Sequence, residues 1–212
     1  MQARGRAAQT LWQAYVQQRS SSLGLSLPSS KSLWDVVNRS RLEPHNADAI
    51  RDIWIEFHAD PMKHRTASVM PAARYVKFAE HASKSPMFVL PVFKGPNAFE
   101  NFVAQCQLPL VLFTSLEEYK QRGPGAQPQF VLTHYTELMS DKDIVLVRGD
   151  IVNPNAVSRL EAETLTRLLH DFYTIDQKYY GFVYPFNHRQ ADFDLKKMLD
   201  SLGHDTTQLP RD

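Results

Sequence analysis

The sequence predicts an α+β fold: a single domain with a twisted, mostly antiparallel β-sheet flanked by helices. Three strand candidates lie within residues 87–114, and links this short leave no room for the crossover helices of a parallel sheet. Two apolar runs, 130–135 and 144–147, flank a short polar connection. We therefore expect them to form an antiparallel pair in the middle of the sheet.

The two paired runs differ in their expected burial. Residues 130–135 alternate with a period of two, which is typical of a half-buried strand. Residues 144–147 are continuously apolar and rich in β-branched side chains, which indicates a strand covered on both faces. Further strands are expected over 66–70, 87–93, 99–105, 110–114 and 180–184, and Pro91 marks the second of these as an edge strand or a bulge.

Helical periodicity predicts the elements that flank the sheet. Asn46 is expected to cap a helix that reaches about His58, and Pro71 to open a second helix. A long helix is expected over 155–174, a single helical turn over 115–120, and a last helix that ends at Gly203. The residues expected to form buried helix faces are Ala49, Ile50, Ile53, Trp54 and Phe57; Tyr75, Phe78, Ala79 and Ala82; Leu160, Thr164, Leu165, Leu168, Leu169 and Phe172; and Leu195, Met198, Leu199 and Leu202.

The chain is expected to divide into one folded domain with a tail at each end. Residues 1–31 contain Arg and Ser but no acidic residue and carry one amphipathic face, which is typical of a mitochondrial transit peptide. Residues 32–205 are expected to form the α+β domain and 206–212 a disordered tail. A net charge of +1 argues against a nucleic-acid-binding protein. No apolar run approaches the roughly 18 residues of a membrane span, so we expect no membrane insertion.

No local motif predicts catalysis. The loop 123–125 lacks the Lys and Ser/Thr that follow a phosphate-binding loop, and no two histidines have metal-ligand spacing. Cys106 is the single cysteine, which excludes an internal disulfide, and we expect it to be a structural residue. His134, Tyr135 and Glu137 are expected to form a hydrogen-bonded structural cluster. We therefore expect no catalytic residue, no cofactor and no metal ion.

An ordered series of short motifs resembles a known family. The motifs are LWDVV (33–37), IW (53–54) with HA (58–59), FTSLEEY (113–119), HY (134–135) with EL (137–138), IVL (144–146), FY (172–173), and YGFV (180–183) ending in FN (186–187). Together they resemble the mitochondrial ATP synthase F1 assembly factors that chaperone the β subunit. The resemblance covers about residues 32–202 and is weakest over 93–97.

The resemblance implies a chaperone and not an enzyme. Members of this family bind unassembled F1 β subunit in the mitochondrial matrix, prevent its aggregation and release it to the α subunit. This implies an exposed apolar and aromatic groove on a protein that is monomeric when free. The residues that the resemblance offers as partner contacts are Trp34, Phe113, Tyr119, Tyr135, Leu138, Tyr180 and Phe186.

Two alternative functions stay open at this point. An enzyme with a dispersed site would need His134, Glu137, Tyr180 and His188 to converge in a deep pocket, with at least one strongly shifted pKa. A permanent structural subunit of a mitochondrial complex would need an apolar face much larger than a standard protein interface.

Overall fold

Six strands form one antiparallel sheet in the computed structural model, which describes residues 31–95 and 98–203. Strands β2 to β6 follow one another as a meander, and β1 lies beside β6 at the sheet edge, in the order β1-β6-β5-β4-β3-β2. The predicted α+β fold and the predicted antiparallel pairing of β5 with β6 are confirmed, although this pair lies nearer the β1 edge than the β2 edge and not in the middle of the sheet. The strands are β1 (Arg65–Pro71), β2 (Met87–Gly95), β3 (Ala98–Gln107), β4 (Leu110–Ser115), β5 (Phe130–Tyr135) and β6 (Ile144–Ile151).

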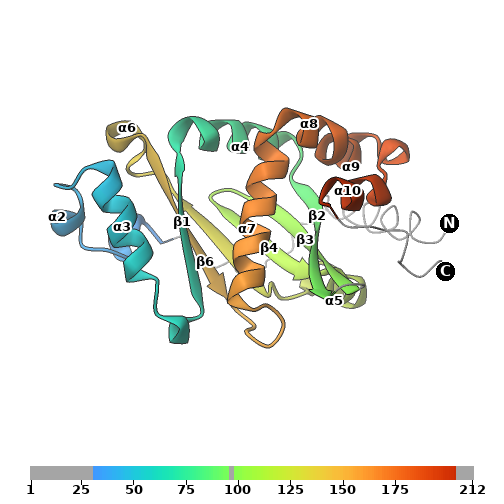
Figure 1. The fold of residues 1–212 in the computed structure, drawn as a ribbon, viewed down its shortest axis with the longest axis horizontal. Coiled ribbons are helices and arrows are strands. Elements are labelled where there is room, and N and C mark those ends of the chain that lie inside the picture. The colour runs from blue at the N-terminus through green and yellow to red at the C-terminus, as the bar shows by residue number, and fades with distance from the viewer. Residues whose placement is uncertain (1–30, 96–97, 204–212) are drawn as a thin grey trace.

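Helices cover both faces of this sheet (Figure 1). α4 (Ala72–Lys84) and α7 (Arg159–Thr174) pack against one face, called here the helix face. On the second face, α3 (Ala47–Phe57) covers the end formed by β1, β6 and β5, while α5 (Leu116–Arg122) packs near β3. The other helical segments are η1 (Leu33–Asp35), α2 (Arg39–Leu42), η2 (Pro61–Lys63), η3 (Gly123–Gly125), α6 (Met139–Lys142), α8 (Asp176–Lys178), the π-helix η4 (Tyr179–Val183), α9 (Tyr184–His188), η5 (Gln190–Asp192) and α10 (Leu195–Ser201).

The main core lies between the sheet and the two helices of the helix face. Phe78 of α4 and Phe172 of α7 are fully buried there, and each such aromatic side chain contributes about 1.5–3 kcal/mol through the apolar area it removes from water. A second core lies under α3, where Trp54 packs edge-on against Tyr135 of β5. Because both faces of β5 are covered, all six of its residues are buried, and the prediction of a half-buried strand is wrong.

The predicted strand at 180–184 is also wrong, since this segment is helical. Aromatic residues favour strands in general, but tertiary packing decides here. Tyr179 and Val183 are four residues apart, so they share one helical face, and both are buried. The Tyr179 ring stacks on His81 of α4 at 3.6 Å between centroids. Pro185 lies in the first turn of α9, where a helix needs no backbone N–H donor.

Element boundaries differ from prediction where side-chain caps decide them. α7 begins after Ser158, which forms a capping box with Glu161, and not at residue 155. Leu160, expected in the core, is therefore on the outer side of the first turn and is 73% exposed. Asn46 caps α3 as predicted, with its Oδ1 accepting a hydrogen bond from the Ala49 N–H at 2.9 Å. The predicted targeting segment, as far as residue 30, and the predicted tail 206–212 lie outside the described residues.

A candidate partner-binding surface

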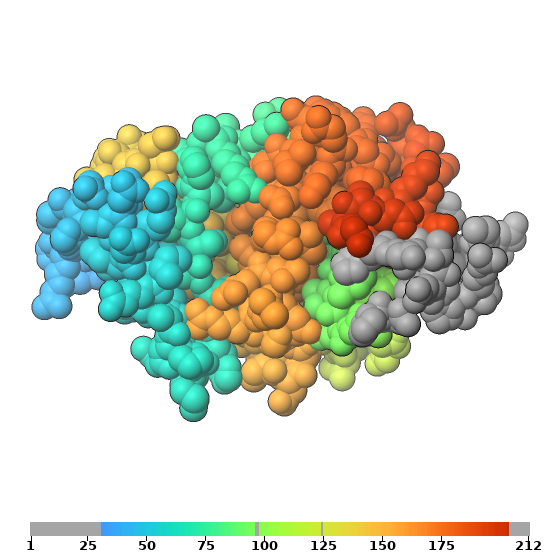
Figure 2. Space-filling model, viewed as in Figure 1, coloured from blue at the N-terminus to red at the C-terminus, as the bar shows by residue number. Residues whose placement is uncertain are grey.

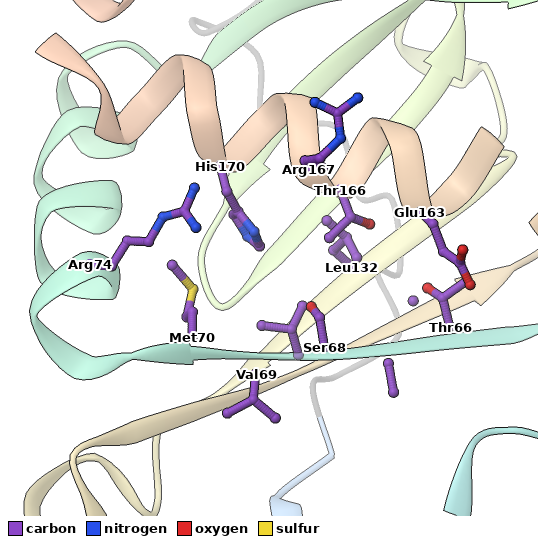
Figure 3. Close-up of a pocket in the computed structure, with 13 residues that line it drawn as sticks. Thr66, Ser68, Val69, Met70, Arg74, Leu132, Glu163, Thr166, Arg167 and His170 are labelled. Carbon is purple, nitrogen blue, oxygen red and sulfur yellow. The ribbon is translucent and has the colours of Figure 1, made fainter. Parts of the chain in front are cut away.

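A groove of about 200 Å³ separates the edge strand β1 from α7 (Figure 3). Thr66, Ser68 and Met70 of β1 form one wall, because alternate side chains of a strand share a face. α7 supplies the opposite wall, from which Thr166 and His170 project at helical spacing.

His170 lines the groove and forms a hydrogen bond with His134, a buried residue outside the lining, and the two rings fix each other's protonation. His134 Nδ1 is 3.1 Å from the Pro109 carbonyl oxygen, which can only accept, so Nδ1 carries the proton. Its Nε2 lies 3.0 Å from His170 Nε2. Desolvation lowers the pKa of His134 to about 4 and that of His170 well below its usual value, so both rings are neutral at pH 7.

This arrangement leaves an acceptor that faces the groove. Since His134 Nε2 is unprotonated, His170 Nε2 must donate the shared hydrogen bond, and His170 Nδ1 then carries a lone pair. Within the described part of the chain, no group donates a hydrogen bond to that Nδ1. The bottom of the groove can therefore accept a hydrogen bond from a bound molecule.

Arginine side chains lie at the rim of the groove. Arg74 of α4 donates to Asp171 at 2.8 Å and to Thr174 at 3.2 Å. Arg167 of α7 lies 3.7 Å from the same Asp171 carboxylate. Two guanidinium groups thus share one carboxylate, which leaves a surplus positive charge at this rim.

Among the described helices, α3 carries the largest number of exposed, large apolar side chains. Ile50 and Trp54 are buried against the sheet, and the Trp54 Nε1–H donates to the Val147 carbonyl oxygen at 3.1 Å. Ile53, Ile55 and Phe57 are 38%, 42% and 48% exposed, so the prediction that Ile53 and Phe57 belong to the buried stripe is wrong. The reason is that only Ile50 and Trp54 point at the sheet, while Ile53 and Phe57 lie on one flank of this pair and Ile55 on the other. Figure 2 shows α3 next to β1 and on the same visible side of the molecule as α7.

The seven predicted contact residues do not form one surface. Phe113, Tyr119, Tyr135 and Leu138 are buried in three different hydrophobic clusters and offer a partner no side-chain surface in this structure. They are packing residues in this structure because each lies within one of these clusters. Trp34 and Phe186 are half-buried, and Tyr180 is 58% exposed at the far end of the molecule. Their role in binding stays a prediction.

The residues of the enzyme alternative do not converge. His134 lies in the helix-face core, whereas Glu137 accepts hydrogen bonds from Leu33 N at 2.6 Å and Ser32 Oγ at 3.1 Å on the other side of the sheet. Tyr180 is exposed, and His188 Nε2 lies 3.2 Å from Ser85 Oγ. The predicted cluster of His134, Tyr135 and Glu137 is therefore wrong, because successive strand residues point to opposite faces.

The described residues also give no support to a cysteine nucleophile, a metal site or a membrane-spanning helix. Burial raises the pKa of the Cys106 thiol to about 12, so it is protonated at neutral pH and is a poor nucleophile. No group of three His, Cys, Asp or Glu side chains within 31–95 and 98–203 has the arrangement of a metal site. Over the same ranges, no helix has both the length and the apolar character needed to cross a bilayer.

Sequence reasoning missed the groove residues Arg74, Arg167 and His170. They come from two helices that are far apart in the chain, and their spacing matches no local ligand motif. The exposed residues of α3 could have been found from the sequence. Ile53, Ile55 and Phe57 extend around more of the helix than a single narrow buried stripe covers.

Comparisons with known proteins connect this chain to a family. The chain is 29% identical to ATP synthase mitochondrial F1 complex assembly factor 1 of Homo sapiens over 88% of its own length and 58% of that protein. It is 28% identical to the Mus musculus protein of the same name over 81% of this chain and 52% of that one. It is 29% identical to the mitochondrial protein atp11 of Schizosaccharomyces pombe over 62% of this chain and 49% of that one. The chain thus spans about half the length of these curated relatives. A family model described as ATP11 protein matches residues 7–199, and the chain belongs to this family.

Proposed function

We propose that this protein is a chaperone for assembly of the F1 sector of ATP synthase in the mitochondrial matrix. It binds unassembled F1 β subunit, prevents its aggregation and hands it over to the α subunit. The observation that carries the proposal is membership of a family whose curated relatives are named F1 assembly factors or mitochondrial proteins. The protein acts by binding and not by catalysis.

The exposed side of α3 supplies a physical basis for this activity. An unassembled subunit exposes the apolar surface that its partner later covers, and such a surface promotes aggregation. Ile53 and Phe57, which are one helical turn apart and share a side of α3, offer a complementary apolar surface that can cover it for a time. Binding lowers the free energy of the subunit by RT ln(1 + c/Kd), where c is the chaperone concentration, so the stabilisation grows with the logarithm of that concentration. For the β subunit to pass to the α subunit, the chaperone must bind the β subunit more weakly than the α subunit does.

The experiment that tests the proposal is light scattering of isolated F1 β subunit during heating, with and without an equimolar amount of this protein and without ATP. We expect suppressed scattering and a co-eluting complex that free α subunit disrupts. Absence of both suppression and complex formation overturns the proposal. A complex that the α subunit cannot displace would instead identify a permanent subunit.

A further inference from the structure

The outer edge of β1 carries hydrogen-bonding groups that no described residue satisfies. The bonds from Ile151 N to His64 O and from Ala72 N to Asp143 O, each 2.9 Å, bracket the pairing of β1 with β6. In an antiparallel pair, the residues that bond the neighbouring strand alternate with residues that point away from it. Arg65, Ala67 and Val69 therefore direct their N–H and C=O groups outward. All three residues are partly exposed.

The opposite edge of the sheet is blocked. The 2.7 Å bond from Cys106 N to Pro86 O gives β2 the same alternation, so Met87 and Pro91 face outward. The Asn187 side chain occupies both groups of Met87, accepting from its N–H at 3.3 Å and donating to its carbonyl at 2.6 Å. Pro91 has no N–H, and a bulge interrupts the strand between Phe93 and Gly95. These are the devices by which proteins prevent strand addition, and β1 lacks them over 65–69.

Positive charge flanks β1 on both faces of the sheet. On the second face, Arg65 and Arg148 share the Asp150 carboxylate at 3.2 and 2.8 Å. On the helix face, Arg74 and Arg167 share Asp171. Each set of two guanidinium groups and one carboxylate carries a surplus charge of one. Glu163, which also lines the groove, is paired with Arg159 at 3.1 Å, so the surplus remains and the edge complements an acidic chain.

We propose that β1 binds an extended, acidic segment of the client protein as an added strand. The backbone of that segment pairs with the outward groups of Arg65, Ala67 and Val69. Its side chains alternate between the groove, where acidic side chains meet Arg74 and Arg167, and the second face beside α3. The identity of the client rests on the proposed function, whereas the mode of binding rests on the edge itself.

Proline substitution tests the backbone part of the inference. Ala67→Pro removes an outward N–H and places a ring against an incoming strand, while the bonds between β1 and β6 remain. We expect binding of isolated F1 β subunit, measured by calorimetry, to weaken by about tenfold or more because strand hydrogen bonds and close approach are lost. The matched control is Val89→Pro on the outward side of the blocked strand β2, which should bind as the unaltered protein does. Unfolding midpoints establish that each variant is folded.

A charge reversal tests the electrostatic part. Arg167→Glu should weaken binding about tenfold at low ionic strength and less at high salt. Arg122→Glu is the control, since the Arg122 and Arg167 side chains are 63% and 64% exposed and each pairs with a carboxylate four residues away. Amide hydrogen exchange at Ala67 and Val69 should slow on addition of the β subunit, and this readout decides the matter if Ala67→Pro does not fold.

The outcomes separate this inference from the proposed function. Unchanged binding by folded Ala67→Pro and by Arg167→Glu, or unchanged exchange at Ala67 and Val69, overturns strand addition and leaves the chaperone proposal intact. No binding of the β subunit by the unaltered protein overturns the chaperone proposal, and the present inference with it.

Discussion

His134 and His170 show what burial does to individual residues. Both rings lie in the helix-face core, where desolvation disfavours the charged form and lowers each pKa, and the hydrogen bond to Pro109 only partly offsets this for His134. Phe78 stacks on His134 at 5.0 Å between centroids, which keeps water from that side of the pair. The folded state therefore requires both histidines to be neutral, so its stability decreases in acid.

The stability of the protein should fall as the pH drops below about 6.5, the ordinary pKa of a histidine side chain. The unfolded chain binds a proton at His134 near that value, whereas the folded chain does so only at a pKa of about 4. Because the unfolded state holds more protons between these values, the free energy of unfolding decreases, by roughly 2 kcal/mol for this residue at pH 5. Urea unfolding at pH 7.5 and pH 5 measures the loss.

His134→Gln should reduce that pH dependence. A glutamine amide can donate to the Pro109 carbonyl and accept from His170 but does not titrate in this range. His45→Gln is the control, since His45 is exposed. If His134→Gln keeps the full loss of stability between pH 7.5 and pH 5, the burial argument for this residue is wrong.

At the scale of elements, the segment η4–α9 protects the edge of β2. Asn187 of α9 is buried and makes hydrogen bonds to both backbone groups of Met87 and to the Val183 carbonyl at 2.8 Å. A single side chain thus replaces the neighbouring strand that Met87 lacks. The helical form of 179–188 is what brings this amide to the sheet.

Asn187→Ala should destabilise the protein by about 2–3 kcal/mol. The substitution leaves the Met87 N–H and C=O groups without partners in a buried position, which costs more than the hydrogen bonds themselves contribute. Denaturant unfolding measures the change, with the exposed Asn155→Ala as control. A loss below 0.5 kcal/mol, on the order of a surface substitution, would mean that water satisfies Met87 instead.

At the scale of the whole molecule, α3 and the open edge of β1 lie next to each other (Figure 1). One supplies exposed apolar side chains and the other unpaired backbone groups with a surplus of positive charge. The β2 edge at the opposite end of the sheet is blocked by Asn187 and Pro91. A client is therefore expected to bind at the β1 end.

The double variant Ile53→Ser, Phe57→Ser should weaken binding of F1 β subunit by about tenfold, because two partly exposed apolar contacts are lost. Its free energy of unfolding should change by less than about 1 kcal/mol, since neither side chain belongs to the buried stripe. Val76→Ser on α4 is the control, a similarly exposed apolar residue on a helix that lies on the other face of the sheet from α3. Equal binding by the double variant and the control would exclude α3 from the contact surface.

The sequence by itself determined what depends on short-range physics. Alternation and apolar runs located β5 and β6, closely spaced strands excluded a parallel sheet, and Asn46 fixed the start of α3 through its own cap. Periodicity likewise located the buried face of α4 around Tyr75 and Phe78. These features depend on residues a few positions apart, so they can be read along the chain.

Only the tertiary structure decided which apolar residues are covered and which distant residues meet. Phe113 and Tyr135 are aromatic residues of the kind expected in a binding surface, yet they are buried in the core. Ile53 and Phe57 fit the helical pattern of core residues, yet they are exposed. The meeting of His134 with His170, and of Asn187 with Met87, joins positions 36 and 100 residues apart. The same holds for the placement of β1 at an open edge beside β6. Burial is a property of the assembled layers, and no local pattern of residues records which layer lies above which side chain.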